Sequence, residues 1–404
     1  MSRAALLAIA CLLAGCADRI AAAQPPALDA VRTDAPGRTP ALQRPAAVAP
    51  FFAALARTER EGAVARVTHL GDSSIGLDDF PNRLRAVYQR RHGDAGVGFV
   101  LLQPHTRSYA NRGVWLRPGP EWELCFIIRR CARDGHYGLG GVTVSSRGGA
   151  RTVVAPREGR SISRAELWYA AHPRGGRIGL RFGPGRSVEL PTRADALEDR
   201  WHTLTREAGE HPVQVTAEGG GLARAYGVVL ENEGPGVVWD TLSMIGAFTH
   251  RLLEHDEAHF AAQLAHRAPD LVVLSYGGND LRRVVGGIVD EDGLADETAR
   301  LLERVRRAVP DAGCLLIGIN DHELSGPVEV EPEHVRAVVR AQRRATERAG
   351  CAYYDVVEAM GGPGSFEGWR RRGLASSDGK HLAPRGRAII ADRLVAAMDH
   401  ASGQ

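Results

Sequence analysis

Hydrophobic and polar positions follow three successive patterns along this chain. From Phe51 onward, apolar residues recur at helical spacing, then fill a strand-like run from Ala65 to Leu70, and then return to helical spacing. The second helical stretch extends from about Asp79 to Arg91 and places Leu84 and Tyr88 on one face. A helix, a strand and a helix in succession indicate the start of an α/β unit.

The pattern changes after about Gln103. Short apolar or alternating runs follow one another there, separated by clusters of Gly, Pro and Arg; they are GVTVSS, RTVVA, AELWYAA, RIGLRF and VQVTA. Many short strands between such turn signals are typical of β-sandwiches. We therefore expect a β-rich, sandwich-like module over residues 106–232.

The α/β pattern resumes near Glu233. Four apolar runs there predict buried strands: GVVWDTLSMIGA, PDLVVLSYGGND, GCLLIGIND and GCAYYDVVEAM. Helical patterns lie between them, including Asp296 to Val309 and Glu333 to Ala349. Because strands that alternate with helices form parallel sheets, we expect one α/β domain made of residues 51–105 and 233–404, interrupted by the β-rich module.

The N-terminus has the layout of a targeting sequence. Arg3 precedes a short apolar run that ends at Leu13, and small residues follow, which predicts a signal peptide over residues 1–15. The run is far shorter than the roughly 20 apolar residues that span a bilayer. The residues Leu-Ala-Gly-Cys that end at Cys16 resemble a bacterial lipobox, which implies that Cys16 is lipidated. An ordinary signal peptide with a chance cysteine is the alternative.

Residues 16–50 are rich in Ala and Pro and predict a flexible linker behind the lipid anchor. Ala17 follows the cysteine at the position where Asp often marks retention in the inner membrane. We therefore expect an exported protein, periplasmic or at the cell surface, that is anchored through its lipid to the bacterial outer membrane.

Export makes the other cysteines informative, because the periplasm and the cell surface are oxidising. Apart from Cys11 and Cys16 there are four, which allow three pairings: Cys125, Cys131, Cys314 and Cys351. The first two are close in sequence, and the last two each open an apolar strand-like run. We expect disulfides within these two pairs, with free buried thiols as the alternative.

Composition and charge exclude several partners. The chain has 404 residues, 44% of them hydrophobic, and its net charge of +3 comes from 51 basic and 48 acidic residues without a block of like charge. Nucleic acid is therefore not an expected partner. No Cys/His spacing resembles a zinc site, so we expect no metal and no cofactor. His255 and His259 lie one helical turn apart, but Asp256 stands where a zinc peptidase has Glu, and we expect a solvated helix face there.

Three polar clusters follow predicted strands. They are Gly71-Asp72-Ser73, Gly277-Gly278-Asn279-Asp280, and the loop SSDGKHLAPRG ahead of the last helix. In an open parallel sheet, sites form beyond the carboxyl ends of the strands. We therefore expect the three clusters to converge.

Ser73 alone is most simply the first residue of a helix, where Ser caps a backbone N–H. As a nucleophile it would need a base. Asp378 and His381 offer one, because a carboxylate three residues away can hold one imidazole nitrogen while the other faces the serine, which are the roles of a catalytic triad. An isolated Asp-x-x-His on a loop is otherwise a solvated surface pair.

Two further residues could stabilise an oxyanion. The Asn279 side chain can donate an N–H to a tetrahedral intermediate, and the backbone N–H of Gly246 can do the same because no side chain blocks the approach. Asp72 and Asp280 are expected to hold loops through hydrogen bonds. Ile75 occupies the last position of the Gly-x-Ser-x-Gly elbow, which argues against the usual α/β-hydrolase arrangement.

In chain order, the sets that contain Ser73, Gly246, Asn279 and His381 resemble the four blocks of the SGNH hydrolases, also called GDSL esterases. The resemblance implies a flavodoxin-like three-layer α/β fold, with Ser73 as nucleophile, His381 as base and Asp378 as its partner. It also implies an oxyanion hole made by the backbone N–H groups of Ser73 and Gly246 and the side chain of Asn279.

The phrases HLGDSSIGLDDF, GDAGVGFV, GPGVVWDTLSMIGA and MGGPGSFEGW resemble a bacterial branch in which a β-rich module interrupts the hydrolase. Relatives of that layout include peptidoglycan O-acetylesterases, whose insert resembles a carbohydrate-binding module. The resemblance implies a secreted serine esterase that removes an acyl group, which we expect to be acetyl, from an envelope or extracellular glycan. A sugar O-acyltransferase with the same triad and a non-catalytic glycan-binding lipoprotein are the alternatives.

Two other groups have simpler explanations. Asp321-His322-Glu323 follows a predicted strand and is expected to be a polar loop, although it could line the substrate cleft. Five aromatic residues of the module are expected in its core, although they could form a sugar-stacking platform: Trp115, Trp122, Trp168, Tyr169 and Trp201.

Overall fold

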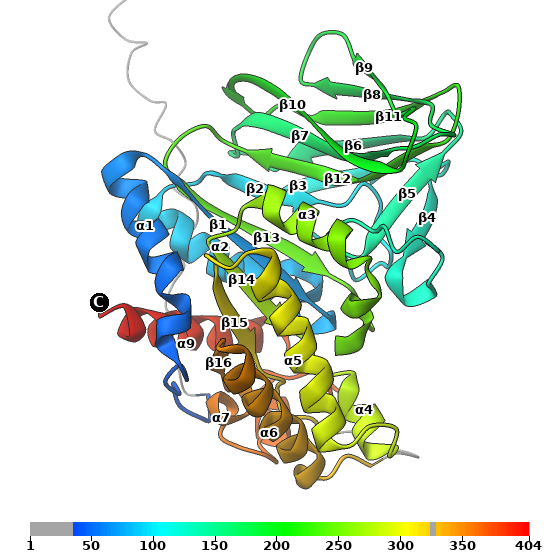
Figure 1. Cartoon of the computed structure of the whole chain (residues 1–404). Coiled ribbons are helices and arrows are strands. Elements are labelled where there is room, and N and C mark those ends of the chain that lie inside the picture. Colours follow the sequence, from blue (N-terminus) through cyan, green and yellow to red (C-terminus); the bar gives the residue numbers. More distant parts are fainter. Residues whose placement is uncertain (1–34, 324–328, 404) are drawn as a thin grey trace, which may run out of the picture. The chain divides into compact units, whose positions relative to one another are not determined.

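A five-stranded parallel sheet organises the α/β part of the chain in the computed structural model, which describes residues 35–323 and 329–403. Its strands, in spatial order, are β13 (Gly236–Ser243), β1 (Val64–Gly71), β14 (Leu271–Ser275), β15 (Gly313–Ile317) and β16 (Ala352–Tyr354). Numbered along the chain, this is the order 2-1-3-4-5 of flavodoxin-like sheets. The predicted flavodoxin-like α/β fold with an inserted β module is confirmed (Figure 1).

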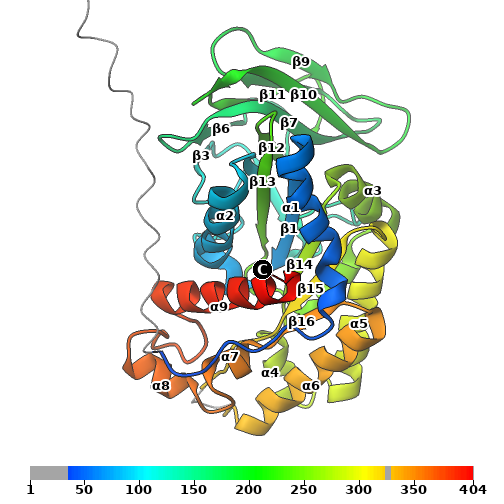
Figure 2. The same ribbon diagram turned by 90° about the vertical axis from the view of Figure 1, so that its left-hand side faces the viewer.

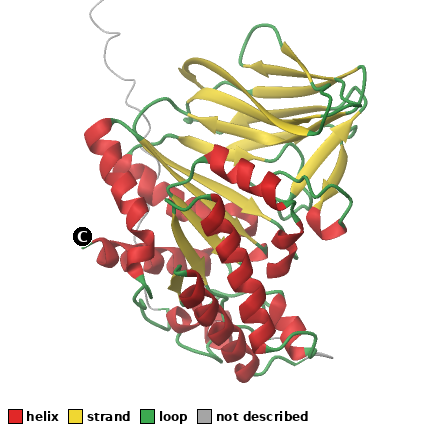
Figure 3. Cartoon of the chain, in the orientation of Figure 1, coloured by secondary structure: helices red, strands yellow, loops and turns green. Residues whose placement is uncertain are grey.

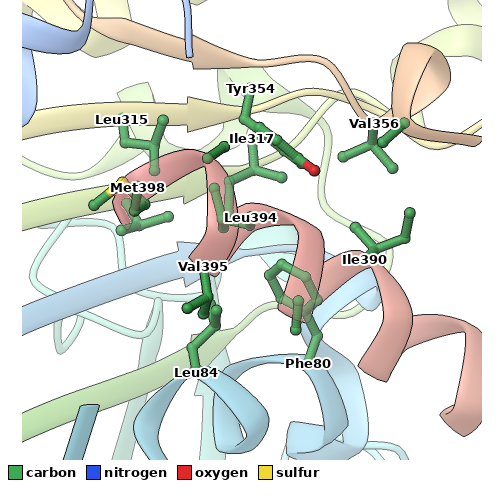
Figure 4. Close-up of a cluster of buried hydrophobic side chains, with 14 of the residues drawn as sticks. Phe80, Leu84, Leu315, Ile317, Tyr354, Val356, Ile390, Leu394, Val395 and Met398 are labelled. Atoms are coloured by element: carbon green, nitrogen blue, oxygen red, sulfur yellow. The ribbon is translucent and has the colours of Figure 1, made fainter. Parts of the chain in front are cut away.

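Helices cover both faces of this sheet. One face is covered by α1 (Ala49–Glu61), α2 (Asp79–His92) and α9 (Pro384–Ser402), and the other by α3 (Glu257–Arg267), α5 (Glu291–Ala308) and α6 (Pro332–Ala349) (Figure 2). The shorter helices are α4 (Asp280–Val285), α7 (Val356–Met360) and α8 (Phe366–Arg371), with the 3-10 turns η1 (Pro45–Val48), η2 (Ser73–Asp78), η3 (Ile127–Arg129) and η4 (Thr249–Glu254). Figure 4 shows Leu394 and Val395 of α9 beside Phe80 and Leu84 of α2, in the apolar layer beneath the sheet.

The predicted elements of the α/β part match the structure closely. The strand expected at 65–70 is β1, and the helix expected at 79–91 is α2. The helices expected at 296–309 and 333–349 are α5 and α6. Helix α5 begins earlier than expected, at Glu291, because the Asp290 carboxylate accepts a hydrogen bond from the Gly293 N–H at 2.8 Å and caps the helix.

The inserted module is a sandwich of two antiparallel sheets (Figure 3). One sheet has the order β10 (Glu198–Gly209), β7 (Ile162–Ala171), β12 (Ala223–Glu231), β5 (Val142–Ser146) and β4 (Glu123–Phe126). The other has the order β3 (Val114–Pro118), β6 (Arg151–Pro156), β11 (Val213–Gly219), β8 (Arg177–Phe182) and β9 (Val188–Pro191). Buried side chains such as Leu167 and Val228 from the first sheet meet Val154 and Leu180 from the second.

The boundary between module and α/β domain differs from the expected break after residue 105. Strand β2 (Gly96–Val100) pairs with β12 and so extends a sheet of the module. Phe99 and Trp168 belong to the same buried cluster as Leu242 of β13 and Phe260 of α3. Because the two parts share this apolar cluster, the module is packed against the α/β domain and does not have an independent core on this side.

The expected linker over residues 16–50 is too long, because its last part is packed. Leu42 and Val48 are buried. The backbone of Gln43 exchanges two hydrogen bonds with Tyr353 of β16, at 3.0 and 3.2 Å, and so covers the edge of the sheet. The predicted signal peptide and Cys16 lie outside the described residues. Of the helices within the described ranges, none has the length and apolar character needed to cross a bilayer.

Two disulfides join the cysteine pairs that the sequence favours. Cys125–Cys131 links β4 to the segment after η3. Cys314–Cys351 links β15 to the residue before β16, two neighbouring strands of the parallel sheet.

Candidate active site

Ser73 lies just beyond the carboxyl end of β1, as the first residue of η2. Strand β1 stands between β13 and β14, and the connections that precede these two strands carry helices on opposite faces of the sheet, α2 before β13 and α3 before β14. Such a switch point is where open α/β sheets bind ligands. Glycine is needed at position 71 because neighbouring atoms leave no room for a side chain at this turn. A Cβ there would lie 2.8 Å from the Ile75 side chain and 2.9 Å from the Ser275 carbonyl oxygen.

The turn behind Ser73 is strained, and a buried ion pair holds it. Leu77 and Asp78 both have left-handed backbone angles, with φ of 61° and 60°. The Asp78 carboxylate is fully buried and accepts hydrogen bonds from the Arg85 guanidinium of α2, both at 3.0 Å. It also accepts from the Thr241 hydroxyl of β13 at 2.6 Å and the Arg112 backbone N–H at 2.7 Å. Four segments of the chain therefore meet at one carboxylate.

Ser73, His381 and Asp378 form a hydrogen-bonded chain. His381 Nε2 lies 2.8 Å from Ser73 Oγ, and His381 Nδ1 lies 2.6 Å from Asp378 Oδ2. Because a carboxylate only accepts, the proton is on Nδ1, and Nε2 accepts the hydrogen bond of the serine hydroxyl. The structure thus brings together the three residues in the geometry that nucleophilic catalysis requires. Their catalytic roles stay predictions.

The Asp378 carboxylate is held ionised. Burial opposes its charge, but hydrogen bonds from the Ser376 hydroxyl, the His381 ring and the backbone N–H groups of Lys380 and His381 outweigh burial and lower the pKa of Asp378 well below its ordinary range. A permanently charged partner fixes the tautomer of His381 and can stabilise the imidazolium that forms when it takes a proton.

Asn279 lies close to the nucleophile turn. It follows β14 and is only 6% exposed. Its Nδ2 donates to the Ala247 carbonyl oxygen at 2.9 Å and, less closely, to Asp72 Oδ2 at 3.3 Å, while its Oδ1 accepts from Lys380 Nζ at 2.7 Å. The amide is therefore oriented from both ends. Lys380 belongs to the same polar loop as Asp378 and His381, but no sequence pattern predicted a role for it.

Two hydrogen bonds hold the loop that carries Gly246. The Met244 N–H donates to the Gly71 carbonyl oxygen at 2.7 Å, beside Ser73. The Ile245 N–H donates to His105 Nε2 at 3.0 Å, and burial lowers the pKa of His105 to about 4, so its ring is neutral and can accept. Gly246 itself is exposed with φ of 85°, a conformation that favours glycine, and its N–H stays a predicted oxyanion donor.

Asp72 and Asp280 hold loops, as expected. Asp72 Oδ1 accepts from the Ser74 N–H at 2.8 Å. Asp280 is fully buried, and one of its oxygens accepts from both the N–H and the hydroxyl of Thr249, at 2.8 Å each. Asp280 therefore ties the turn after β14 to the Gly246 loop.

A cleft opens beside Ser73 and encloses a cavity of about 60 Å³. Its apolar lining includes Ile75, Phe80, Ile317, Val356 and Ile390. Its polar lining includes His381, His322 and Lys380. The nucleophile therefore faces a small space lined by both apolar and polar side chains.

The expected polar loop at Asp321-His322-Glu323 is buried in two of its three residues. Asp321 accepts from the backbone N–H groups of Gly364 and Phe366 at 2.9 and 2.8 Å and so anchors the start of α8. His322 lines the cleft. Its Nδ1 lies 2.7 Å from the Asn320 carbonyl oxygen and must donate to it, which leaves Nε2 as an acceptor, and burial lowers the pKa of His322 to about 4. The ring is therefore a neutral acceptor near the nucleophile.

The expectation of a solvated face at His255 and His259 is wrong. Both are buried, at 3% and 4% exposed, because α3 packs beneath the module. His259 Nδ1 lies 2.7 Å from Asp199 of β10, and its Nε2 lies 2.5 Å from the Tyr137 carbonyl oxygen. His136, Asp199 and His259 could form a metal site, but both ring nitrogens of His259 are already in hydrogen bonds. This contact joins the module to the hydrolase.

A second possible metal group contains His250, Asp280 and Glu297. Arg283 donates to both carboxylates, at 2.8 Å to Asp280 and 2.6 Å to Glu297, so their charges are already balanced.

Among the aromatic residues of the module, Trp122, Trp168 and Tyr169 are in buried clusters as expected and Trp201 is partly buried. Trp115 differs, being 50% exposed beneath the Arg157 guanidinium.

Comparison with known proteins agrees with this geometry. A model of the GDSL-like lipase/acylhydrolase family matches residues 204–389, which include Gly246, Asn279, Asp378 and His381. Over residues 204–389, this chain is therefore similar to the GDSL-like lipases and acylhydrolases. Ser73 lies outside the matched range, and the module separates it in sequence from the other site residues. In the structure, β1 pairs with β14, and Ser73 lies within hydrogen-bonding distance of His381. This match, together with the hydrogen-bonded chain of Ser73, His381 and Asp378, identifies a carboxylic ester hydrolase.

A solved structure shares the fold of this chain. This structure, described as a peptidoglycan O-acetylesterase in action, matches with a TM-score of 0.73 and 21% identity, covering 89% of this chain and 97% of that chain. A family two carbohydrate esterase from Cellvibrio japonicus matches with a TM-score of 0.30 and 12% identity, covering 72% of this chain and 98% of that chain. A sequence comparison with curated proteins found no significant match.

We predict that Asp78→Ala lowers the free energy of unfolding by about 3–5 kcal/mol, because it leaves the Arg85 guanidinium buried without its partner. Urea unfolding measures the loss. The matched control is Asp392→Ala, which removes the partner of Arg83, another arginine of α2, from a more exposed ion pair. This variant should lose no more than about 1 kcal/mol. Equal losses in the two variants would contradict a special role for Asp78.

We also predict that Asn279→Ala lowers kcat for a simple acetyl ester by a factor on the order of 10²–10³, because one oxyanion donor is lost. Steady-state kinetics on p-nitrophenyl acetate measure it, with thermal unfolding recorded in parallel to detect damage to the fold. An unchanged kcat would remove Asn279 from the oxyanion hole.

Proposed function

We propose that this protein is an exported serine esterase that removes O-acetyl groups from an envelope glycan such as peptidoglycan, through an acyl-enzyme. The observation that carries the proposal is the Ser73–His381–Asp378 chain of hydrogen bonds at the mouth of a small cleft. The match over 97% of a structure described as a peptidoglycan O-acetylesterase supports this choice of substrate.

In the acylation step, Ser73 Oγ attacks the ester carbonyl carbon while His381 Nε2 takes the hydroxyl proton. Asp378 holds the opposite nitrogen and stabilises the imidazolium. The negative charge on the carbonyl oxygen is met by the backbone N–H groups of Ser73 and Gly246 and the amide of Asn279. His381 then gives its proton to the departing sugar hydroxyl, which leaves an acetyl group on Ser73.

In the deacylation step, water enters beside His381, which takes a proton from it as it attacks the acetyl-serine. The second tetrahedral intermediate uses the same oxyanion donors. When it collapses, His381 returns the proton to Ser73 Oγ and acetate leaves. The cycle needs the ester and water only.

The size and lining of the cleft support a small acyl group. The cavity of about 60 Å³ ends against buried side chains such as Phe80 and Ile390, whereas a long acyl chain would need a deeper apolar channel. The polar residues of the lining, His322 and Lys380, support a leaving group that is rich in hydroxyls.

Export and anchoring form part of the proposal. The two disulfides, which are typical of oxidising compartments, support an exported protein. We propose that the signal peptide directs export, that Cys16 carries the lipid, and that the anchor holds the enzyme at the outer membrane next to its glycan.

The decisive test is acetate release from O-acetylated peptidoglycan by the protein and by its Ser73→Ala variant. We expect release by the first and none by the second, because the variant lacks the nucleophile but keeps the cleft. An enzyme that hydrolyses p-nitrophenyl acetate but releases nothing from this glycan would contradict the substrate. An acyl-sugar product formed with an added glycan acceptor would favour the transferase alternative.

A further inference from the structure

Lys380 is the only lysine in the sequence, and every other one of its 51 basic side chains is Arg. It lies between Asp378 and His381 in the catalytic loop and lines the cleft. Elsewhere in the described chain, Arg serves in ion pairs on the surface, in the core and between the module and the hydrolase. A lone lysine at this position therefore calls for a reason specific to its shape and chemistry.

The Lys380 side chain is aimed by its own backbone. Its N–H donates to Asp378 Oδ1 at 2.9 Å, and its carbonyl oxygen accepts from Asn320 Nδ2 at 2.8 Å. The half-buried side chain then reaches Asn279, where Nζ donates to Oδ1 at 2.7 Å. The loop that carries the base of the triad thus also reaches the predicted oxyanion donor.

This contact decides which way the Asn279 amide points. An ammonium group can donate but cannot accept, so the oxygen of the amide must face Lys380 and its NH₂ group must face away. One N–H of that group is engaged by Ala247 at 2.9 Å, and the other has only the longer contact of 3.3 Å with Asp72. The N–H that faces Asp72 has the weaker of the two contacts and is therefore the one available to donate to an oxyanion.

The charge matters as well as the direction. A positive group on the amide oxygen draws electrons from the nitrogen and makes its N–H a stronger donor, as in other charge-assisted hydrogen-bond chains. A compact ammonium fits this task within the half-buried site, whereas an Arg side chain would bring a wide planar fork with five donors. Burial lowers the pKa of Lys380 from its ordinary value of 10.5, partly opposed by the nearby Asp72 carboxylate.

We infer that Lys380 is a positioning residue, whose ammonium group orients and polarises the Asn279 amide so that this amide donates to the oxyanion. The inference rests on the proposed roles of Ser73 and Asn279 in ester hydrolysis, but it does not depend on which glycan is the substrate. It distinguishes Lys380 from a group that binds the substrate directly and from one that only stabilises the loop.

The test compares the full protein with its variants on p-nitrophenyl acetate. Lys380→Met should lower kcat about ten-fold and leave KM within about two-fold, because the affected hydrogen bond strengthens only as the oxyanion forms. Lys380→Arg, which keeps a charged donor, should retain more of kcat. The matched control is Arg282→Met, which removes the cation that neighbours Lys380 and should change kcat by less than about two-fold.

The double variant Lys380→Met/Asn279→Ala decides whether the two residues act as a unit. If Lys380 acts through the amide, the double variant should be no slower than Asn279→Ala alone, because nothing is left to orient. In the wild type, kcat should also fall at high pH as the ammonium loses its proton. That alkaline limb should be absent in Lys380→Met and should move to higher pH in Lys380→Arg, with uncatalysed hydrolysis subtracted.

Three results would overturn the inference. A raised KM with unchanged kcat would make Lys380 a substrate-binding group. Losses that multiply in the double variant would show that it acts independently of Asn279, and a fall in kcat matched by early thermal unfolding, without recovery in Lys380→Arg, would show a structural role. Failure of the proposed function is visible separately, because Ser73→Ala and Asn279→Ala are measured alone in the same assay.

Discussion

The buried ion pair between Asp78 and Arg85 is the constraint on which the site depends. Two consecutive residues other than glycine adopt left-handed angles directly behind the nucleophile, and such angles persist only where the surroundings enforce them. Asp78 supplies that enforcement by collecting hydrogen bonds from α2, β13 and the segment that opens the module. Ser73 therefore keeps its place at the end of β1 only while the helix, the sheet and the start of the module are in place.

The module is consequently part of the catalytic architecture. Strand β2 extends a sheet of the module, and the segment after it contributes His105 to the Gly246 loop and Arg112 to Asp78. Phe99 of β2 is buried in the cluster that also contains residues of β13 and α3. An insertion fixed at these points helps to hold the turn and the loop beside Ser73 even if it binds no sugar.

The sequence predicted what depends on local pattern. Apolar runs located the strands of the parallel sheet, and motif spacing located Ser73, Asn279, Asp378 and His381. It missed features that depend on long-range contact. Strand β10 lies at the edge of its sheet and is mostly polar, so no apolar run marked it in the sequence. The predicted linker extended too far because the packing of Gln43 depends on its partner at the edge of β16, which is distant in sequence. His322 and Lys380 lie in polar loops, and nothing in their own neighbourhoods reveals which side chains they will meet.

The site as a whole separates two electrostatic tasks on either side of Ser73. On one side, Asp378 holds His381 for proton transfer, and its lowered pKa keeps it charged throughout the cycle. On the other side, Asp72 and Lys380 contact opposite ends of the Asn279 amide. Burial raises the pKa of Asp72, while hydrogen bonds from Ser74 and the charge of Lys380 oppose that rise. Asp72 and Lys380 therefore each favour the charged form of the other. Because Lys380 is covalently next to His381, any shift of this loop moves the base and the oxyanion donor together, which keeps proton transfer and charge stabilisation in register.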